Sequence, residues 1–351
     1  MDSTNKSYVI WNNKGGVGKS TITFHIACVY AEKNPQRDVV VIDMCPQANC
    51  STMLLGGGRG GEKILQNLIS LDTPRTVVGY ITDTIIKENK EPQHYLIRVR
   101  EENNKLPGNI YLLSGDGNLE LIAPLLSRRA EAEPISEKDT PWKNIHLIIK
   151  NLTKESISVG RPVTFFIDTN PSFSIYTQLG IIAGDFLLVP INADDSSIFA
   201  ISGLFNLIYG SKKKHPVYDK YTFVTRIKEN NLDRPKIHLL LGNRFTQKKG
   251  AAHAFKALSN EATKKMHEEY IENKRWFRDH NTSITSQNDF ETEFTIELRD
   301  FNSAGVVASN LGIPLSLMDK NLYEVYGEQI QVAKEQRDKC KETIDKIVDR
   351  L

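Results

Sequence analysis

A glycine-rich segment near the N-terminus has the residues that bind the phosphates of a nucleotide. Residues 13–20 read NKGGVGKS, which matches the pattern G-x-x-x-x-G-K-[ST] except that Asn13 replaces the first glycine. In such a loop the backbone N–H groups and the positive end of the following helix face the phosphates. Lys19 would reach the β- and γ-phosphates, and the Ser20 hydroxyl would ligate Mg²⁺. A second cation, Lys14, would lie beside the same triphosphate. The residues expected to bind ATP here are Lys14, Gly15, Gly16, Val17, Gly18, Lys19, Ser20 and Thr21.

Two aspartates complete a magnesium site. Asp43 and Asp168 each end a hydrophobic run, VVVID and VTFFID. The carboxyl ends of parallel strands meet at one edge of a sheet, where ligands bind. Mg²⁺ prefers oxygen ligands and keeps several waters, so Ser20 and one or two carboxylates would suffice. The alternative is that each aspartate only ends its strand.

The elements that position these residues alternate between strands and helices. Short β-branched runs are typical of parallel strands covered on both faces, and they occur at residues 7–11, 39–43, 109–114, 163–168, 185–191 and 236–242. Helical patterns separate most of them, at residues 20–33, 172–183, 196–209 and 251–270. We therefore expect an α/β fold of the P-loop type, a doubly wound, mostly parallel sheet with helices on both faces.

Several segments fall outside this alternation. We expect residues 1–351 to form a single domain with insertions near 56–108, 128–160 and 246–293. The glycine-rich residues 56–63 are expected to be a loop, and residues 320–351 a long charged helix ending the chain.

Composition narrows the class of protein. The 351 residues carry a formal net charge of only +2, so nucleic acid would have to bind to a local patch. The four cysteines have no zinc-ligand spacing, no signal peptide is visible, and no apolar run approaches the ~18 residues of a membrane span. We expect a cytoplasmic protein.

Six motifs in succession resemble those of the ParA/MinD ATPases, the deviant Walker A proteins, and most closely the ParA branch. They are KGGVGKS, VIDMCPQANCST, FFIDTNPS, DFLLVPINADDSSIFAISGL, LLLGNRF and LRDFNSAGVVASNLGIPL. The resemblance implies that ATP closes a sandwich homodimer in which Lys14 reaches the partner's nucleotide, as an arginine finger does. It also implies that Asn243 recognises adenine, with Arg244 beside it. Lys14, Lys19 and Asp43 are the residues we expect to act on the transferring phosphate.

One position departs from the family pattern. The family's D-x-D-P-Q motif has a second aspartate that handles the attacking water, whereas this chain has Cys45 there. A neutral thiol is a poor base and a weak hydrogen-bond acceptor. Asp43 could partly substitute. We therefore expect slow or partner-stimulated hydrolysis.

The resemblance also implies the partners. We expect the ATP dimer to bind DNA without sequence preference, as nucleoid-associated partition proteins do, and a ParB-like protein to stimulate it. Candidate basic clusters are Lys212–Lys214, Lys248–Lys249, Lys264–Lys265 and Lys274, Arg275 and Arg278. A MinD-like membrane role is disfavoured because the C-terminal stripe lacks aromatic residues. A metal-cluster reductase of this fold would need later cysteines, and none lies between Cys50 and Cys340. A nucleotide-gated, protein-binding adaptor remains an alternative.

Overall fold

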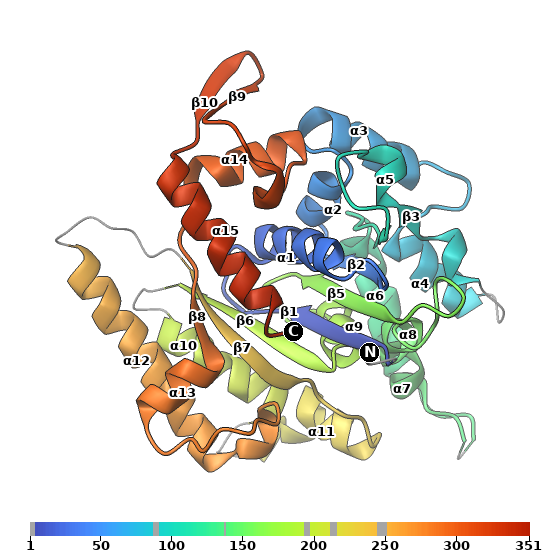
Figure 1. Ribbon diagram of the computed structural model, residues 1–351. Coiled ribbons are helices and arrows are strands. Elements are labelled where there is room, and N and C mark those ends of the chain that lie inside the picture. The colour runs from blue at the N-terminus through green and yellow to red at the C-terminus, as the bar shows by residue number, and fades with distance from the viewer. Residues whose placement is uncertain (1–3, 87–90, 137, 193–196, 211–215, 244–250) are drawn as a thin grey trace.

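An eight-stranded sheet forms the centre of the molecule (Figure 1). The computed structural model describes residues 4–86, 91–136, 138–192, 197–210, 216–243 and 251–351. The strand order is β3-β4-β2-β5-β1-β6-β7-β8, and neighbours are parallel except β3 and β4. The strands are β1 (Lys6–Ile10), β2 (Asp38–Met44), β3 (Ile97–Arg98), β4 (Ile110–Leu113), β5 (Val163–Thr169), β6 (Phe186–Asn192), β7 (Lys236–Asn243) and β8 (Thr295–Glu297). The predicted fold class is confirmed, and all six predicted strands are present.

Helices cover both faces of this sheet and enclose two hydrophobic cores. One face carries α1 (Lys19–Lys33), α2 (Asn49–Leu54), α3 (Gly58–Ile69), α5 (Val99–Glu102), α14 (Asn302–Leu311), η5 (Leu315–Leu317) and α15 (Lys334–Val348). The other carries α4 (Val77–Ile86), α6 (Leu119–Ala130), α7 (Pro141–His146), α8 (Ile148–Leu152), α9 (Ile175–Ala183), α10 (Ser197–Leu204), η2 (Phe205–Tyr209), α11 (Phe223–Glu229), α12 (Ala251–Glu272) and α13 (Gln287–Phe294). Three short turns are η1 (Pro92–His94), η3 (Asp219–Tyr221) and η4 (Lys274–Trp276).

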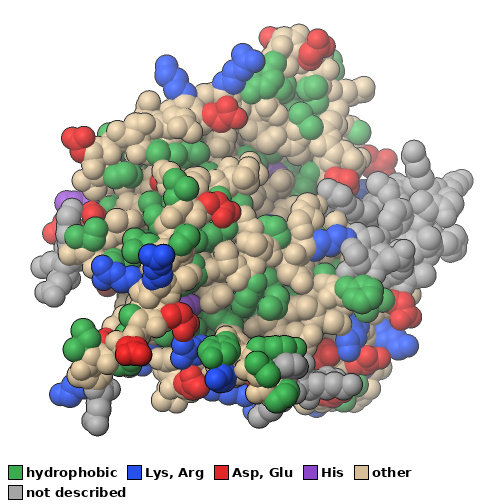
Figure 2. Space-filling model, turned by 180° about the vertical axis from the view of Figure 1, so that it is seen from behind, with side chains coloured by type: hydrophobic (Ala, Val, Ile, Leu, Met, Phe, Trp, Pro, Cys, Tyr) green, Lys and Arg blue, Asp and Glu red, His purple; other side chains and the backbone are tan. Residues whose placement is uncertain are grey.

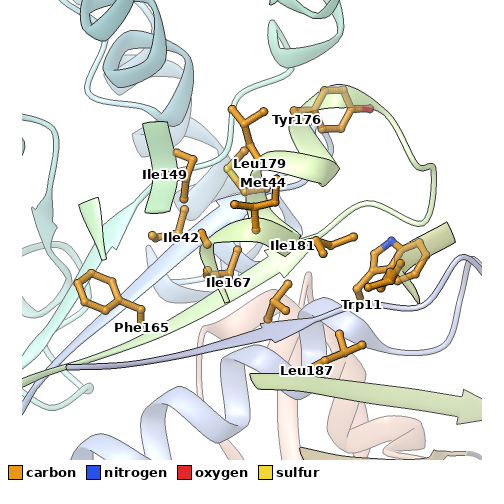
Figure 3. Close-up of a cluster of buried hydrophobic side chains, with 14 of the residues drawn as sticks. Trp11, Ile42, Met44, Ile149, Phe165, Ile167, Tyr176, Leu179, Ile181 and Leu187 are labelled. Atoms are coloured by element: carbon orange, nitrogen blue, oxygen red, sulfur yellow. The ribbon is translucent and has the colours of Figure 1, made fainter. Parts of the chain in front are cut away.

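Strand residues alternate between the two cores, as the period of a β-strand requires. In β2, Ile42 and Met44 enter the core shown in Figure 3, whereas Val41 enters the opposite one. Figure 3 shows Ile42 and Met44 packed with Ile167 of β5 and Leu179 of α9. Because both faces are buried, these strands read as continuous apolar runs.

Two predicted elements at the surface are wrong. Residues 320–351 are not one helix, because β9 (Leu322–Val325) and β10 (Glu328–Gln331) form an antiparallel hairpin before α15 begins at Lys334. Its turn uses Tyr326 and Gly327, both at positive φ (53° and 87°), which suits a two-residue hairpin. Alternating burial along β9 stabilises the strand.

The glycine run at 56–63 is also not a loop, because α3 begins at Gly58. A Cβ at Gly61 would lie 2.4 Å from the carbonyl oxygen of Thr52, so glycine lets α3 pack closely on α2. Each of the three expected insertions contains helices, among them α3, α7, α8 and α12. That they are insertions remains a prediction.

Candidate nucleotide-binding site

The glycine-rich loop joins β1 to α1 at the carboxyl edge of the sheet. Gly16 and Gly18 adopt positive φ (70° and 83°), which a side chain rarely tolerates, whereas Gly15 does not. Val17 is fully buried and anchors the loop to the core. Gly18 is the N-cap of α1 and has no side chain that could bond the first N–H groups of that helix. These donors therefore remain available to an anion.

The two lysines of the loop differ in burial and contacts. Lys19 is 7% exposed, and its ammonium donates to the carbonyl oxygens of Asn12 (3.2 Å) and Lys14 (3.0 Å). Burial lowers the pKa of Lys19, while nearby Asp168 and Cys45 oppose that shift. The Lys14 backbone N–H donates to the Asn12 side chain (3.0 Å), and Lys14 is itself half-buried. The Lys19 ammonium thus lies against the Lys14 backbone, and a role for the Lys14 ammonium at the triphosphate remains a prediction.

Asp43 and Asp168 are direct neighbours in the register of β2 and β5, and both are fully buried. Asp43 accepts hydrogen bonds from the Cys45 N–H (3.0 Å) and from the N–H and hydroxyl of Ser51 (2.9 and 2.7 Å). Burial raises the pKa of Asp43. Burial, followed by repulsion from Asp43, raises the pKa of Asp168 to about 8.

Asp168 fits a magnesium ion better than Asp43 does. Its Oδ2 is buried and has no hydrogen-bond partner among the described residues, and the Ser20 hydroxyl bonds to the same carboxylate. The oxygens of Asp43 already accept three hydrogen bonds. No group of three or more His, Cys, Asp or Glu within the described ranges could hold a metal alone. Ser20 and Asp168 would therefore hold Mg²⁺ together with phosphate and water oxygens, and the ion would neutralise charge on the phosphates. Asp43 as a ligand remains a prediction.

Cys45 lies at the wall of the same site and is 7% exposed. Its sulfur accepts a long hydrogen bond from the Asn170 amide (3.9 Å). Burial, with Asp43 and Asp168 nearby, raises the pKa of the thiol to about 12. At neutral pH Cys45 is therefore a neutral thiol, as its sequence position suggested.

A cavity of about 820 Å³ opens over the loop. Its floor is formed by residues 16–21 and 45–49, and its outer wall by α3, the end of α14 and the tip of the β9–β10 hairpin. The Arg59 backbone N–H donates to the Tyr326 hydroxyl (3.2 Å), and the Arg59 guanidinium lies 5.0 Å from the centre of the Tyr326 ring. Sequence reasoning missed this wall, which includes Glu62, Gln66, Asn310 and Tyr326.

The expected adenine-recognition residues are placed only in part. Asn243 is the last residue of β7 and pairs in register with Asn192 of β6, at the same edge as the loop. Its side chain, and all of Arg244, lie outside the described part of the structure. Both assignments remain predictions.

The structure describes only some of the candidate basic clusters. Residues 212–214 and 248–249 lie outside the described residues. Lys265 pairs with Glu269 (3.0 Å) and Arg278 with Glu293 (2.6 Å), so both cations serve internal ion pairs. Lys264, Lys274 and Arg275 are exposed. On the face seen in Figure 2, basic and acidic side chains are interspersed. No helix in the described ranges is long and apolar enough to cross a membrane.

Comparisons with known proteins show the family. Residues 8–314 match the model of the CobQ/CobB/MinD/ParA nucleotide-binding domain. An uncharacterized protein of Methanocaldococcus jannaschii is 26% identical over 231 residues, which cover 66% of this chain and 69% of that protein.

Solved structures share the fold. An ATP complex of a Cyanothece McdA variant has a TM-score of 0.59 at 16% identity, covering 99% of this chain and 96% of that one. A Borrelia burgdorferi B31 protein identified as a plasmid partition protein, bound to AMPPNP, has a TM-score of 0.53 at 16% identity, covering 98% of each chain. The ParA of pnob8 has a TM-score of 0.51 at 18% identity, covering 83% of this chain and 81% of its own.

Proposed function

Because the chain belongs to the CobQ/CobB/MinD/ParA nucleotide-binding domain family, we propose that it is a ParA-type switch, which ATP converts into a dimer. The observation that carries this proposal is the pair of lysines on one phosphate loop. Lys19 is buried against the loop's own carbonyl groups, as a ligand of the bound triphosphate would be. Lys14 directly precedes the glycines, and in the proposed dimer its ammonium would serve the partner's nucleotide.

The surface beside the loop supports a dimer across the nucleotide. A Cβ at Gly203 of α10 would lie 2.4 Å from the Asn13 side chain, so α10 packs directly on the loop. Phe199 precedes Gly203 by one helical turn, on the same side of α10, and is 82% exposed. A large aromatic side chain in this position is typical of interface anchors.

Because Cys45 replaces a catalytic carboxylate, we expect the protein to bind ATP and dimerise but to hydrolyse ATP slowly. A thiol with a pKa of about 12 does not take a proton from water at neutral pH, and Asp43 is committed to Ser51 and the Cys45 N–H. We therefore infer slow ATP hydrolysis, accelerated by a protein partner of the ParB kind. The ATP-bound dimer would persist long enough to hold DNA without sequence preference, in partition or positioning of a cargo.

Light scattering with ATP or ADP tests the dimer. Wild type should be a dimer with ATP and a monomer with ADP, whereas Lys14→Ala and Phe199→Asp should stay monomeric and still bind a fluorescent ATP analogue. A wild type that is monomeric in both nucleotides would refute the switch.

Filter binding of random DNA with ATP, ADP or no nucleotide, at two salt concentrations, tests the nucleic-acid role. ATP-dependent, salt-sensitive retention supports it. No retention at low salt in any nucleotide state would favour the protein-binding adaptor.

A further inference from the structure

A second cavity, of about 240 Å³, lies at the opposite edge of the sheet from the nucleotide site. Residues 232–236, which lead into β7, form one side of it, and Arg275 and Trp276 of η4 form another. Lys236 begins β7 and Asn243 ends it at the nucleotide edge. The eight residues of β7 separate the two sites by roughly 25 Å. We call this second site the Arg234–Trp276 cavity.

Its wall is rich in cations that lack anionic partners. Among the described residues, neither Arg234 nor Arg275 forms an ion pair, and Lys236 pairs only with Asp279 (2.8 Å), which is 95% exposed. Asp233 also lines the cavity, is exposed, and forms no ion pair within the described ranges. Burial lowers the pKa of Arg234, and the neighbouring Arg275 lowers it further. Two guanidinium groups held near each other repel unless an anion lies between them.

Contacts around the cavity hold Arg234 and Trp276 in place. The Arg234 guanidinium donates to the Tyr209 carbonyl (3.0 Å) and lies 5.8 Å from the centre of the Tyr209 ring. Tyr209 in turn stacks on Trp276 (4.9 Å between centroids, 21° between planes) and donates its hydroxyl to Pro235 O (2.7 Å). The Trp276 indole N–H is buried and has no acceptor among the described residues.

The donors define the chemistry of the ligand. Two guanidinium forks and an indole N–H are all donors, so the ligand must supply several acceptor oxygens and negative charge. Arginine forks match phosphate geometry, and three separate donor groups suit an anion with more than two oxygens. The cavity is smaller than the ~300–1,000 Å³ typical of pockets for whole small molecules. It therefore suits one group that projects from a larger molecule.

We propose that the Arg234–Trp276 cavity binds a backbone phosphate of DNA, with Arg234, Arg275 and the Trp276 indole N–H as its donors. This inference rests on the proposed DNA-binding function and assigns its contact site. The exposed Lys274 is adjacent to Arg275 in the chain and extends the positive surface at the mouth. Of the other described candidates between residues 264 and 278, Lys265 and Arg278 are already in ion pairs, and Lys264 is exposed on α12 and does not line the cavity.

Filter binding of random duplex DNA by the full-length protein with ATP, over a range of salt concentrations, tests the assignment. Arg275→Gln should weaken binding about tenfold and reduce the slope of log K against log[salt] by about 1. Trp276→Phe keeps the stacked ring but removes the N–H, and should weaken binding about threefold. Arg128→Gln, at an exposed site on α6 outside the cavity, removes the same charge and should change binding less than twofold. All three variants should bind a fluorescent ATP analogue as wild type does.

The outcomes separate this inference from the function on which it rests. If wild type retains DNA but the Arg275 and Trp276 variants match the Arg128 control, the cavity assignment is wrong and the DNA-binding function stands. If wild type retains no DNA, both fail. An NMR titration with inorganic phosphate distinguishes a DNA phosphate from free phosphate as the ligand. It follows the indole N–H signals, and the Trp276→Phe variant identifies which signal belongs to Trp276. A shift of the Trp276 signal in a protein that retains no DNA would identify a site for free phosphate and overturn the DNA assignment.

Discussion

Replacing Cys45 with aspartate should accelerate ATP hydrolysis. Cys45 lines the nucleotide cavity, and its thiol pKa is about 12. At pH 7 a group with that pKa is ionised in about one molecule in 10⁵, so no thiolate base is available. An aspartate at this position would be an ionised acceptor once Mg²⁺ and the nearby Lys19 offset its negative neighbours.

The magnitude follows from general-base catalysis, which contributes about 10²- to 10⁴-fold in rate. We expect kcat to rise at least ~10²-fold, equivalent to about 2.7 kcal/mol of barrier. Without nucleotide the same substitution places a third carboxylate beside Asp43 and Asp168, which are fully buried. The free variant should therefore lose about 1–3 kcal/mol of unfolding free energy.

Phosphate release with saturating Mg²⁺ and ATP measures the rate, at a protein concentration that keeps the dimer formed. Cys45→Asn is the matched control, because it has the size of aspartate without its charge, and it should stay at the wild-type rate. Wild type hydrolysing ATP as fast as Cys45→Asp, at equal ATP affinity, would refute the reasoning. Equal acceleration by Cys45→Asn would assign the effect to shape instead of charge.

Three further predictions concern stability and metal binding. Burial lowers the pKa of His25 to about 3, so below pH 6.5 the unfolded chain binds a proton that the folded chain does not. The unfolding free energy should fall by about 2 kcal/mol from this group between pH 7 and pH 5, and in denaturant titrations His25→Asn should show a correspondingly smaller fall; equal pH slopes would contradict this. Because the pKa of Asp168 is about 8, Asp168→Asn should raise the melting temperature in EDTA above pH 8, by relieving repulsion with Asp43 worth on the order of 1 kcal/mol, and should weaken Mg²⁺-dependent ATP binding at least ~10-fold; unchanged Mg²⁺ dependence would exclude Asp168 as a ligand. Gly57→Ala should cost roughly 2–4 kcal/mol in chemical denaturation, because Gly57 has φ 77° and its Cβ would lie 2.4 Å from a backbone nitrogen, whereas Gly60→Ala, with nothing within 4 Å, should be neutral or stabilising.

The parts of this molecule that could be predicted from sequence are those with local physical causes. The six central strands are continuous apolar runs because both faces of the sheet are buried. The phosphate loop needs glycines at 16 and 18 for its positive φ angles. Asp43 and Asp168 meet because each ends a parallel strand, and β2 and β5 are neighbours.

The parts that escaped prediction depend on contacts between distant segments. The edge strands β3 and β8 are two and three residues long and are held by their pairing with β4 and β7. Gly61 reads as a loop residue until α2 is placed against it. The hairpin lies in a charged stretch whose overall pattern predicts a helix. The alternation of exposed and buried residues in β9 covers only four residues, which is too short to indicate a strand from sequence.

The outer wall of the nucleotide cavity also sets when a new chain can hold its ligand. The phosphate loop ends near residue 20, whereas Tyr326, which bonds to the start of α3, is made some 300 residues later. At ~5–20 residues per second, a ribosome takes roughly 15 to 60 seconds to cover that distance. During this interval the emerging chain carries a loop without its closing wall. ATP can therefore bind in the complete cavity only after the ribosome has synthesised the hairpin.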